Sequence, residues 1–151
     1  MASLDMMNMQ LSVFLSGRFT GSTGAQIEIE WMRQMLEALG IIVYPSKSPD
    51  GIDRMDDIAE GVANCDAFVV FGTPNYGEDT GNPKSSFNEF KYAKAEGKTM
   101  AWLNMNGGKM GFSKLKGQAT IMMGLQGVIY KMWEKNDETV EWVANMARQA
   151  R

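Results

Sequence analysis

Asp66-Ala67-Phe68-Val69-Val70-Phe71 is the clearest indication of fold class in the chain, because five apolar residues follow one carboxylate without a break. A short run rich in β-branched and aromatic residues indicates a strand buried on both faces, as strands of parallel sheets are. Apolar side chains at Met55, Ile58, Val62 and Cys65 precede it at helical spacing. A helix followed by such a strand is the second half of a right-handed βαβ unit.

The same alternation of strand-like and helix-like patterns extends in both directions from this run. Further strands are predicted at residues 11–15, 41–44, 100–103 and 127–133, and further helices around residues 32–39, 85–96 and 140–147. Five strands that alternate with helices predict an α/β fold, a flavodoxin-like doubly wound parallel sheet in the order 2-1-3-4-5.

Helix ends are marked by residues with known end preferences. Gly40 and Gly97 each follow a helical pattern, at the place where a left-handed residue is favoured. Asn136-Asp137 precedes the last helix and is expected to cap it.

Length and composition indicate an ordinary globular domain. The chain has 151 residues, a net charge of −3 and a pI of about 5.0. We expect an N-terminal tail at residues 1–10 and one domain at residues 11–151. The acidic balance argues against a nucleic-acid partner. No signal peptide and no apolar run of about 20 residues is present, so a cytoplasmic location without membrane contact is expected.

The chemistry open to the chain is narrowed by the residues it lacks. There is no histidine, which removes the commonest general base and metal ligand, and no metal-ligand spacing is found. The single cysteine, Cys65, ends an apolar helical stripe and is predicted to be a buried, inert thiol. Catalysis would therefore have to use carboxylates, lysines, hydroxyls or backbone groups.

Ligands of doubly wound sheets bind beyond the carboxyl ends of the strands, and two segments there carry candidate residues. In Ser16-Gly17-Arg18-Phe19, glycine allows close approach of a ligand, Arg18 can pair with a phosphate, and Phe19 can stack on a flat ring. An ordinary strand-to-helix turn with a solvated arginine explains the same residues, and spacing alone favours that interpretation.

The second segment runs from Thr73 to Phe90. Tyr76 lies in a turn, Pro74-Asn75-Tyr76-Gly77, and is expected to be an exposed aromatic. Ser86 and Glu89 have the spacing of a capping box, in which the glutamate turns back to its own helix start. Spacing alone favours this structural role for Glu89 over a catalytic one.

Taken in order along the chain, these segments resemble a Toll/interleukin-1 receptor (TIR) domain from about Leu11 to the last helix. The motifs that carry the resemblance are Val13-Phe14-Leu15-Ser16 with Gly17-Arg18, the loop at 45–54, Asn64-Cys65-Asp66 with the strand that follows, Ser85-Ser86-Phe87-Asn88-Glu89-Phe90, and Gly97-Lys98. Each motif is weak alone, and their order and spacing together are more specific.

The resemblance implies the branch of the family that cleaves the nicotinamide–ribose bond of NAD+, because Glu89 stands at the catalytic position. NAD+ would be the substrate, no cofactor would be needed, and ADP-ribose or a cyclic form would result, in immune or cell-death signalling. It further implies a homo-oligomer, or association with other TIR domains, through a loop containing Pro49, Asp50 and Gly51. The implied substrate-binding residues are Ser16, Gly17, Arg18, Phe19, Tyr76, Ser85, Ser86 and Phe87.

One position departs from the enzymatic pattern. Enzymatic TIR domains commonly carry a tryptophan four residues before the glutamate, and this chain has Ser85 there. This departure supports an alternative, a non-enzymatic TIR interaction module. A third hypothesis is a nucleoside deoxyribosyltransferase-like enzyme, for which Asp79 is the nearby second carboxylate.

Overall fold

The computed structural model describes residues 11–17, 25–45, 55–73, 76, 86–105 and 129–150. In these residues the elements run β1 (Ser12–Ser16), α2 (Gln26–Ala38), β2 (Ile42–Tyr44), α3 (Met55–Asn64), β3 (Ala67–Gly72), α4 (Ser86–Ala95), β4 (Thr99–Asn104), β5 (Ile129–Met132) and α6 (Asp137–Gln149). The five strands form one sheet in the order β2-β1-β3-β4-β5, and every neighbouring pair is parallel. The predicted α/β flavodoxin-like fold is confirmed.

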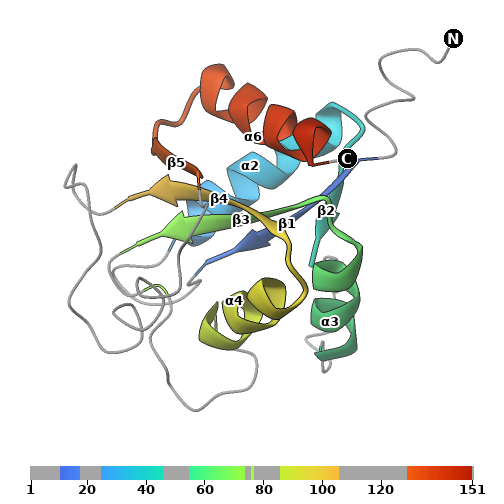
Figure 1. Ribbon diagram of the computed structural model, residues 1–151. Helices are drawn as coiled ribbons and strands as arrows, with labels where there is room; N and C mark the ends of the chain where they lie inside the picture. The colour runs from blue at the N-terminus through green and yellow to red at the C-terminus, as the bar shows by residue number, and fades with distance from the viewer. Residues whose placement is uncertain are drawn as a thin grey trace, which may run out of the picture.

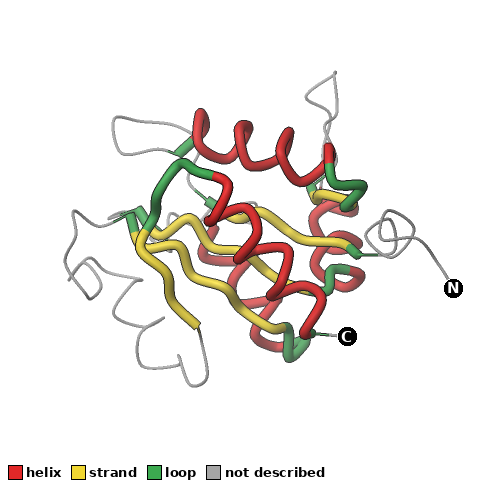
Figure 2. Tube along the Cα trace, turned by 90° about the horizontal axis from the view of Figure 1, so that it is seen from above, coloured by secondary structure: helices red, strands yellow, loops and turns green. Residues whose placement is uncertain are grey.

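Helices cover both faces of the sheet (Figure 1), with α2 and α6 on one side and α3 and α4 on the other. Seen from above, the strands run side by side and the C-terminal helix crosses them (Figure 2). This arrangement divides the buried apolar residues into one cluster under α2 and α6 and a second under α3 and α4.

Side-chain alternation along the central strands assigns each residue to one of these two clusters. On β1, Val13 and Leu15 belong to the cluster under α2 and α6, while Phe14 belongs to the cluster under α3 and α4. Phe14 stacks on Phe68 of β3 with ring centroids 5.2 Å apart. The same alternation directs Ser16, the last residue of β1, towards α3 and α4.

The helix ends agree with the predictions. Gly40 and Gly97 have positive φ values of 80° and 68°, the left-handed conformation expected after a helix. Asn136 is the N-cap of α6 and accepts a hydrogen bond from the Thr139 N–H at 2.9 Å. Cys65 is 3% exposed, which confirms its predicted burial, and that burial raises the pKa of its thiol to about 11.

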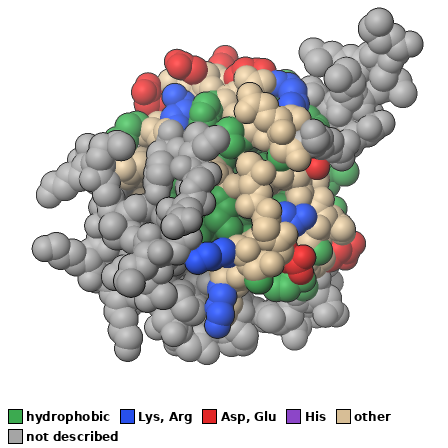
Figure 3. Space-filling view, viewed as in Figure 1, with side chains coloured by type: hydrophobic (Ala, Val, Ile, Leu, Met, Phe, Trp, Pro, Cys, Tyr) green, Lys and Arg blue, Asp and Glu red, His purple; other side chains and the backbone are tan. Residues whose placement is uncertain are grey.

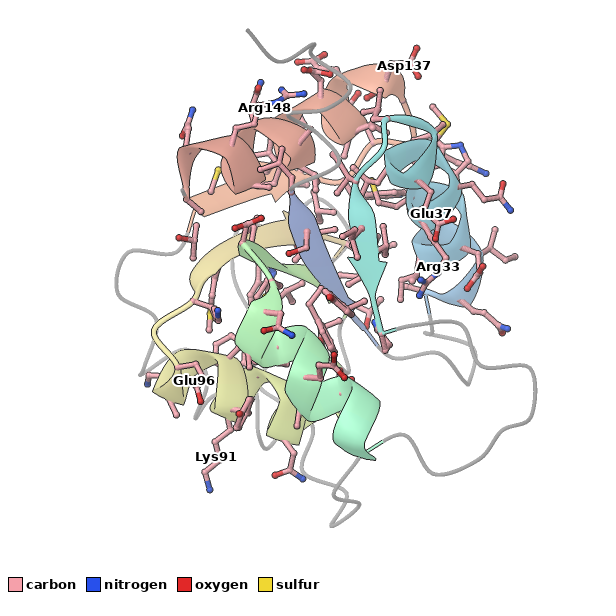
Figure 4. All side chains as sticks on the ribbon, turned by 90° about the vertical axis from the view of Figure 1, so that its right-hand side faces the viewer. Arg33, Glu37, Lys91, Glu96, Asp137 and Arg148 are labelled. Atoms are coloured by element: carbon pink, nitrogen blue, oxygen red, sulfur yellow. The ribbon has the colours of Figure 1, made fainter. Side chains whose placement is uncertain are left out.

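Arg33 was not singled out by the sequence, although it is 5% exposed on α2. Its Nη1 donates to the Val43 carbonyl of edge strand β2 at 3.4 Å and lies 3.9 Å from Glu37. Figure 4 shows Arg33 and Glu37 beside each other on this helix. Hydrogen bonding to an edge carbonyl reduces the backbone available for pairing with another chain.

Candidate functional site

The candidate site begins at the carboxyl end of β1, at Ser16. This serine is fully buried (0% exposed), and β1 pairs there with Val70 of β3. A buried hydroxyl needs hydrogen-bond partners, because water cannot reach it. Among the described residues Ser16 has two, and both come from segments far along the chain.

The first partner is Glu89, in the first turn of α4. The Ser16 hydroxyl donates to Glu89 Oε1 at 2.8 Å, across a separation of 73 residues. The capping-box interpretation predicted that this carboxyl turns back to its own helix start. Among the described residues, the hydrogen bond to Glu89 comes from Ser16 of β1, so α4 presents Glu89 to the carboxyl ends of the strands.

The second partner is Tyr76, whose hydroxyl lies 2.7 Å from Ser16 Oγ. The predicted exposure of Tyr76 is wrong: the residue is 0% exposed. A turn closed by the Tyr76 N–H and the Thr73 carbonyl brings it back towards the sheet. There its ring meets Trp102 and Phe90 edge-on, with centroids 5.4 and 6.4 Å away. A ring packed in this way offers no face to a substrate.

Burial controls the ionisation of the two titratable groups at this site. Removal from water raises the pKa of Glu89 from 4.5 to about 8, and the hydrogen bond from Ser16 opposes the rise. The pKa of Tyr76 lies well above its ordinary value of 10, first through burial and then through the neighbouring Glu89. The tyrosine hydroxyl therefore keeps its proton, and near neutral pH Glu89 is poised to ionise.

A groove of about 420 Å³ lies between α3 and α4, and Glu89 is one of its lining residues. Ile58 and Ala59 of α3 and Tyr92 and Ala95 of α4 form much of its wall. None of these residues was predicted from the sequence to line a ligand site. The signal in the sequence that could have indicated this groove is Tyr92. It is an aromatic residue on the polar side of its helix, and it is 39% exposed.

Figure 4 labels two charged side chains in this region, Lys91 of α4 and Glu96 of the turn that follows α4. Lys91 points away from the sheet, and Glu96 lies at the opposite end of the helix from its start. Both residues are exposed. Glu96 therefore provides a comparison for Glu89, because it is the same residue type, follows directly after the same helix and is solvated.

Gly17, which follows Ser16, lies within the described residues, and the atoms packed around it favour glycine at this position. A Cβ at this position would lie 2.6 Å from Ile29 Cδ1 and 3.2 Å from Phe71 Cβ. Internal packing therefore already favours glycine here, whatever its role towards a ligand.

Several predicted site residues lie outside the described part of the chain: Arg18, Phe19, Ser85 and the loop residues Pro49, Asp50 and Gly51. The same holds for residues 1–10. Ser86 and Phe87 fall within α4, although the positions of their side chains are not described. Of the predicted site residues, the structure thus brings Ser16, Tyr76 and Glu89 together.

Surface charge on the face shown in Figure 3 is unevenly distributed. Acidic side chains gather at the top of the view, where α6 lies, with basic side chains among them, and further acidic and basic side chains are dispersed lower down. Among the described residues, no group of three or more cysteines and carboxylates is placed to hold a metal ion. No helix in that part of the chain is both long and apolar enough to cross a membrane.

Comparisons with known proteins give a distant structural likeness. No protein-family model matches the chain, and no curated protein matches it. A solved structure of a 2-deoxyribosyltransferase from Bacillus psychrosaccharolyticus is similar, with 14% sequence identity and a TM-score of 0.49. The match covers 85% of this chain and 95% of the other. A likeness this distant carries no argument about what the chain binds.

Proposed function

We propose that the chain cleaves the nicotinamide–ribose bond of NAD+, with Glu89 as the catalytic carboxylate. The observation that supports this most directly is the hydrogen bond from Ser16 to Glu89. It holds a carboxyl at the carboxyl ends of the strands of a parallel sheet, where ligands of this fold class bind. The ordered motifs that resemble enzymatic TIR domains add to this support.

The reaction requires little beyond one carboxylate. Heterolysis of the bond between ribose C1′ and the pyridine nitrogen leaves the electron pair on nicotinamide, which departs uncharged and needs no acid. Positive charge develops on the ribosyl centre, as in glycoside cleavage, and the ionised Glu89 offsets that charge. Water then adds to C1′ and releases a proton to solvent, which gives ADP-ribose. Capture by the adenine of the same molecule would give the cyclic product.

The raised pKa of Glu89 suits a cationic substrate. A pyridinium ring beside the carboxyl favours the ionised form, because opposite charges stabilise each other in a site of low polarity. NAD+ would therefore help to ionise Glu89 as it binds. The rate at low substrate concentration should rise with pH towards a plateau above about 8.

The groove between α3 and α4 is a place for a planar base to lie beside Glu89. Its volume of about 420 Å³ falls within the range usual for small-molecule sites. Ile58 and Ala95 supply apolar wall, and Tyr92 supplies an exposed aromatic ring. Contact between such a ring and a cationic pyridine is favourable.

The test compares three proteins and two substrates. The parent chain, Glu89→Gln and Glu96→Gln are each incubated with NAD+, and nicotinamide release is measured over a range of protein concentrations. We expect release by the parent and by Glu96→Gln, with a loss of at least about 100-fold in Glu89→Gln. A rate that rises faster than protein concentration would indicate self-association.

The same samples are then given a 2′-deoxynucleoside, and free base is measured. Base release without NAD+ turnover would replace the proposal with the deoxyribosyltransferase hypothesis. No turnover of either substrate at any protein concentration would favour the non-enzymatic interaction module. Equal NAD+ cleavage by the parent and by Glu89→Gln would show that Glu89 is not the catalytic carboxylate.

A further inference from the structure

Three side chains from separate segments form a continuous hydrogen-bonded chain at the candidate site. The Tyr76 hydroxyl lies 2.7 Å from Ser16 Oγ, and Ser16 Oγ lies 2.8 Å from Glu89 Oε1. Tyr76 and Ser16 are both 0% exposed. This chain, called the Tyr76–Ser16–Glu89 relay below, links the segment after β3 to the end of β1 and the start of α4.

Counting protons gives the relay a direction when Glu89 is ionised. A serine hydroxyl has one proton, and here it is donated to the carboxylate oxygen. Ser16 must then accept from its other neighbour, so Tyr76 donates to Ser16. Tyr76 can serve this role across the working pH range, because its raised pKa keeps its hydroxyl protonated.

We propose that Tyr76 is a positioning residue, whose hydroxyl acts through Ser16 to fix the direction of the Glu89 carboxyl and to favour its ionised form. Donors in series polarise one another, so the bond from Ser16 to the carboxylate is stronger when Tyr76 donates behind it. The catalytic consequence of this relay rests on the proposed function. The effect on ionisation of Glu89 does not.

Packing holds Tyr76 in place independently of its hydroxyl. Its ring contacts Trp102 and Phe90 edge-on within the apolar cluster under α3 and α4. Replacing Tyr76 by phenylalanine therefore removes the donor and keeps the ring. The variant separates the relay from a purely structural role of the side chain.

Among the described residues, few other groups that face Glu89 can influence its ionisation. Ser16 faces it from β1, and Tyr76 is the titratable neighbour beyond Ser16. Across the groove, the lining residues of α3 are apolar. On its own helix, Lys91 and Tyr92 line the groove with it, and both are exposed. A change at Tyr76 should thus reach Glu89 through Ser16.

The experiment titrates Glu89 directly by NMR of carboxyl-labelled glutamate, with the Glu89→Gln spectrum used for assignment. Tyr76→Phe is compared with the parent, and Tyr44→Phe is the matched control, since Tyr44 packs against the same cluster. We expect Tyr76→Phe to raise the pKa of Glu89 by about half to one unit, and Ser16→Ala to raise it by about one to two. Tyr44→Phe should leave it unchanged.

Activity provides the second measurement. The pH at which NAD+ cleavage reaches half its plateau should move upward in Tyr76→Phe by the same amount as the NMR titration. At neutral pH kcat/KM should fall about fivefold, because a smaller fraction of the free protein holds an ionised Glu89. The relay would be overturned if Tyr76→Phe titrates like the parent and like Tyr44→Phe. If the parent releases no nicotinamide, the proposed function fails, and the NMR titration still decides the relay.

Discussion

Replacing Glu89 by glutamine should make the fold more resistant to alkaline pH. Burial raises the pKa of this carboxyl from 4.5 to about 8, so the folded chain holds the proton more tightly than the unfolded chain. The sign follows from linkage: the stability is fully present below pH 4.5 and is lost as pH rises through about 8. Glutamine does not titrate, so the variant escapes this loss.

The size of this loss of stability follows from the two pKa values of Glu89, in the unfolded and in the folded chain. A rise from 4.5 to about 8 corresponds to about 5 kcal/mol at about 1.4 kcal/mol per pH unit. Glu89 is partly exposed as a residue, and solvent screens part of this penalty. We therefore expect about 3 kcal/mol, which is a large part of the 5–15 kcal/mol typical of a small domain.

Urea unfolding at about pH 5 and about pH 9 measures this difference. The parent should lose about 1 to 2 M in its unfolding midpoint between the two pH values, relative to Glu89→Gln. Glu96→Gln is the control and should follow the parent, because Glu96 is exposed. Parallel loss of stability in the parent and in Glu89→Gln would refute the claim that burial raises the pKa of this carboxyl.

Three further predictions address the groove, a helix end and the thiol. Ala95→Phe should narrow the groove beside Glu89 and raise KM for NAD+ about tenfold with kcat little changed, and an unchanged KM would place the base elsewhere. Asn136→Ala should lower the free energy of unfolding by about 1 to 2 kcal/mol, measured in urea, because Thr139 loses its hydrogen-bond acceptor, and Asn136→Asp should restore most of it. Cys65 should react with a thiol reagent at about pH 8 only as the chain unfolds, and rapid labelling of the native chain would contradict its burial.

Much of the fold could be predicted from sequence, because strands and helices leave different local periods. The apolar run at 67–71 and the glycines after two helices encode structure within a few residues of themselves, and the elements appear where these signals place them. The parallel order follows from the alternation of strands with helices, since crossover connections have one preferred hand.

The candidate site could be predicted only in part, because its contacts join distant segments. Ser16 and Glu89 were both candidates, but nothing local shows that they touch across 73 residues. The alternation of side chains along β1 gives one clue. Ser16 lies on the same face of the sheet as Phe14, which is the face that α4 covers. The exposure of Tyr76 was predicted wrongly because a turn residue is usually exposed. Here the turn places the tyrosine ring against the sheet, where it is buried.

The pH profile of a single rate, nicotinamide release, tests the central claim most directly. Nicotinamide release at low NAD+ concentration is followed from about pH 5 to about pH 9 for the parent, Glu89→Gln and Glu96→Gln. The account predicts that the parent and Glu96→Gln rise together to a plateau with an apparent pKa near 8, and that Glu89→Gln stays at least about 100-fold below that plateau and does not rise with pH. Cleavage by Glu89→Gln with the rate and pH dependence of the parent would contradict it.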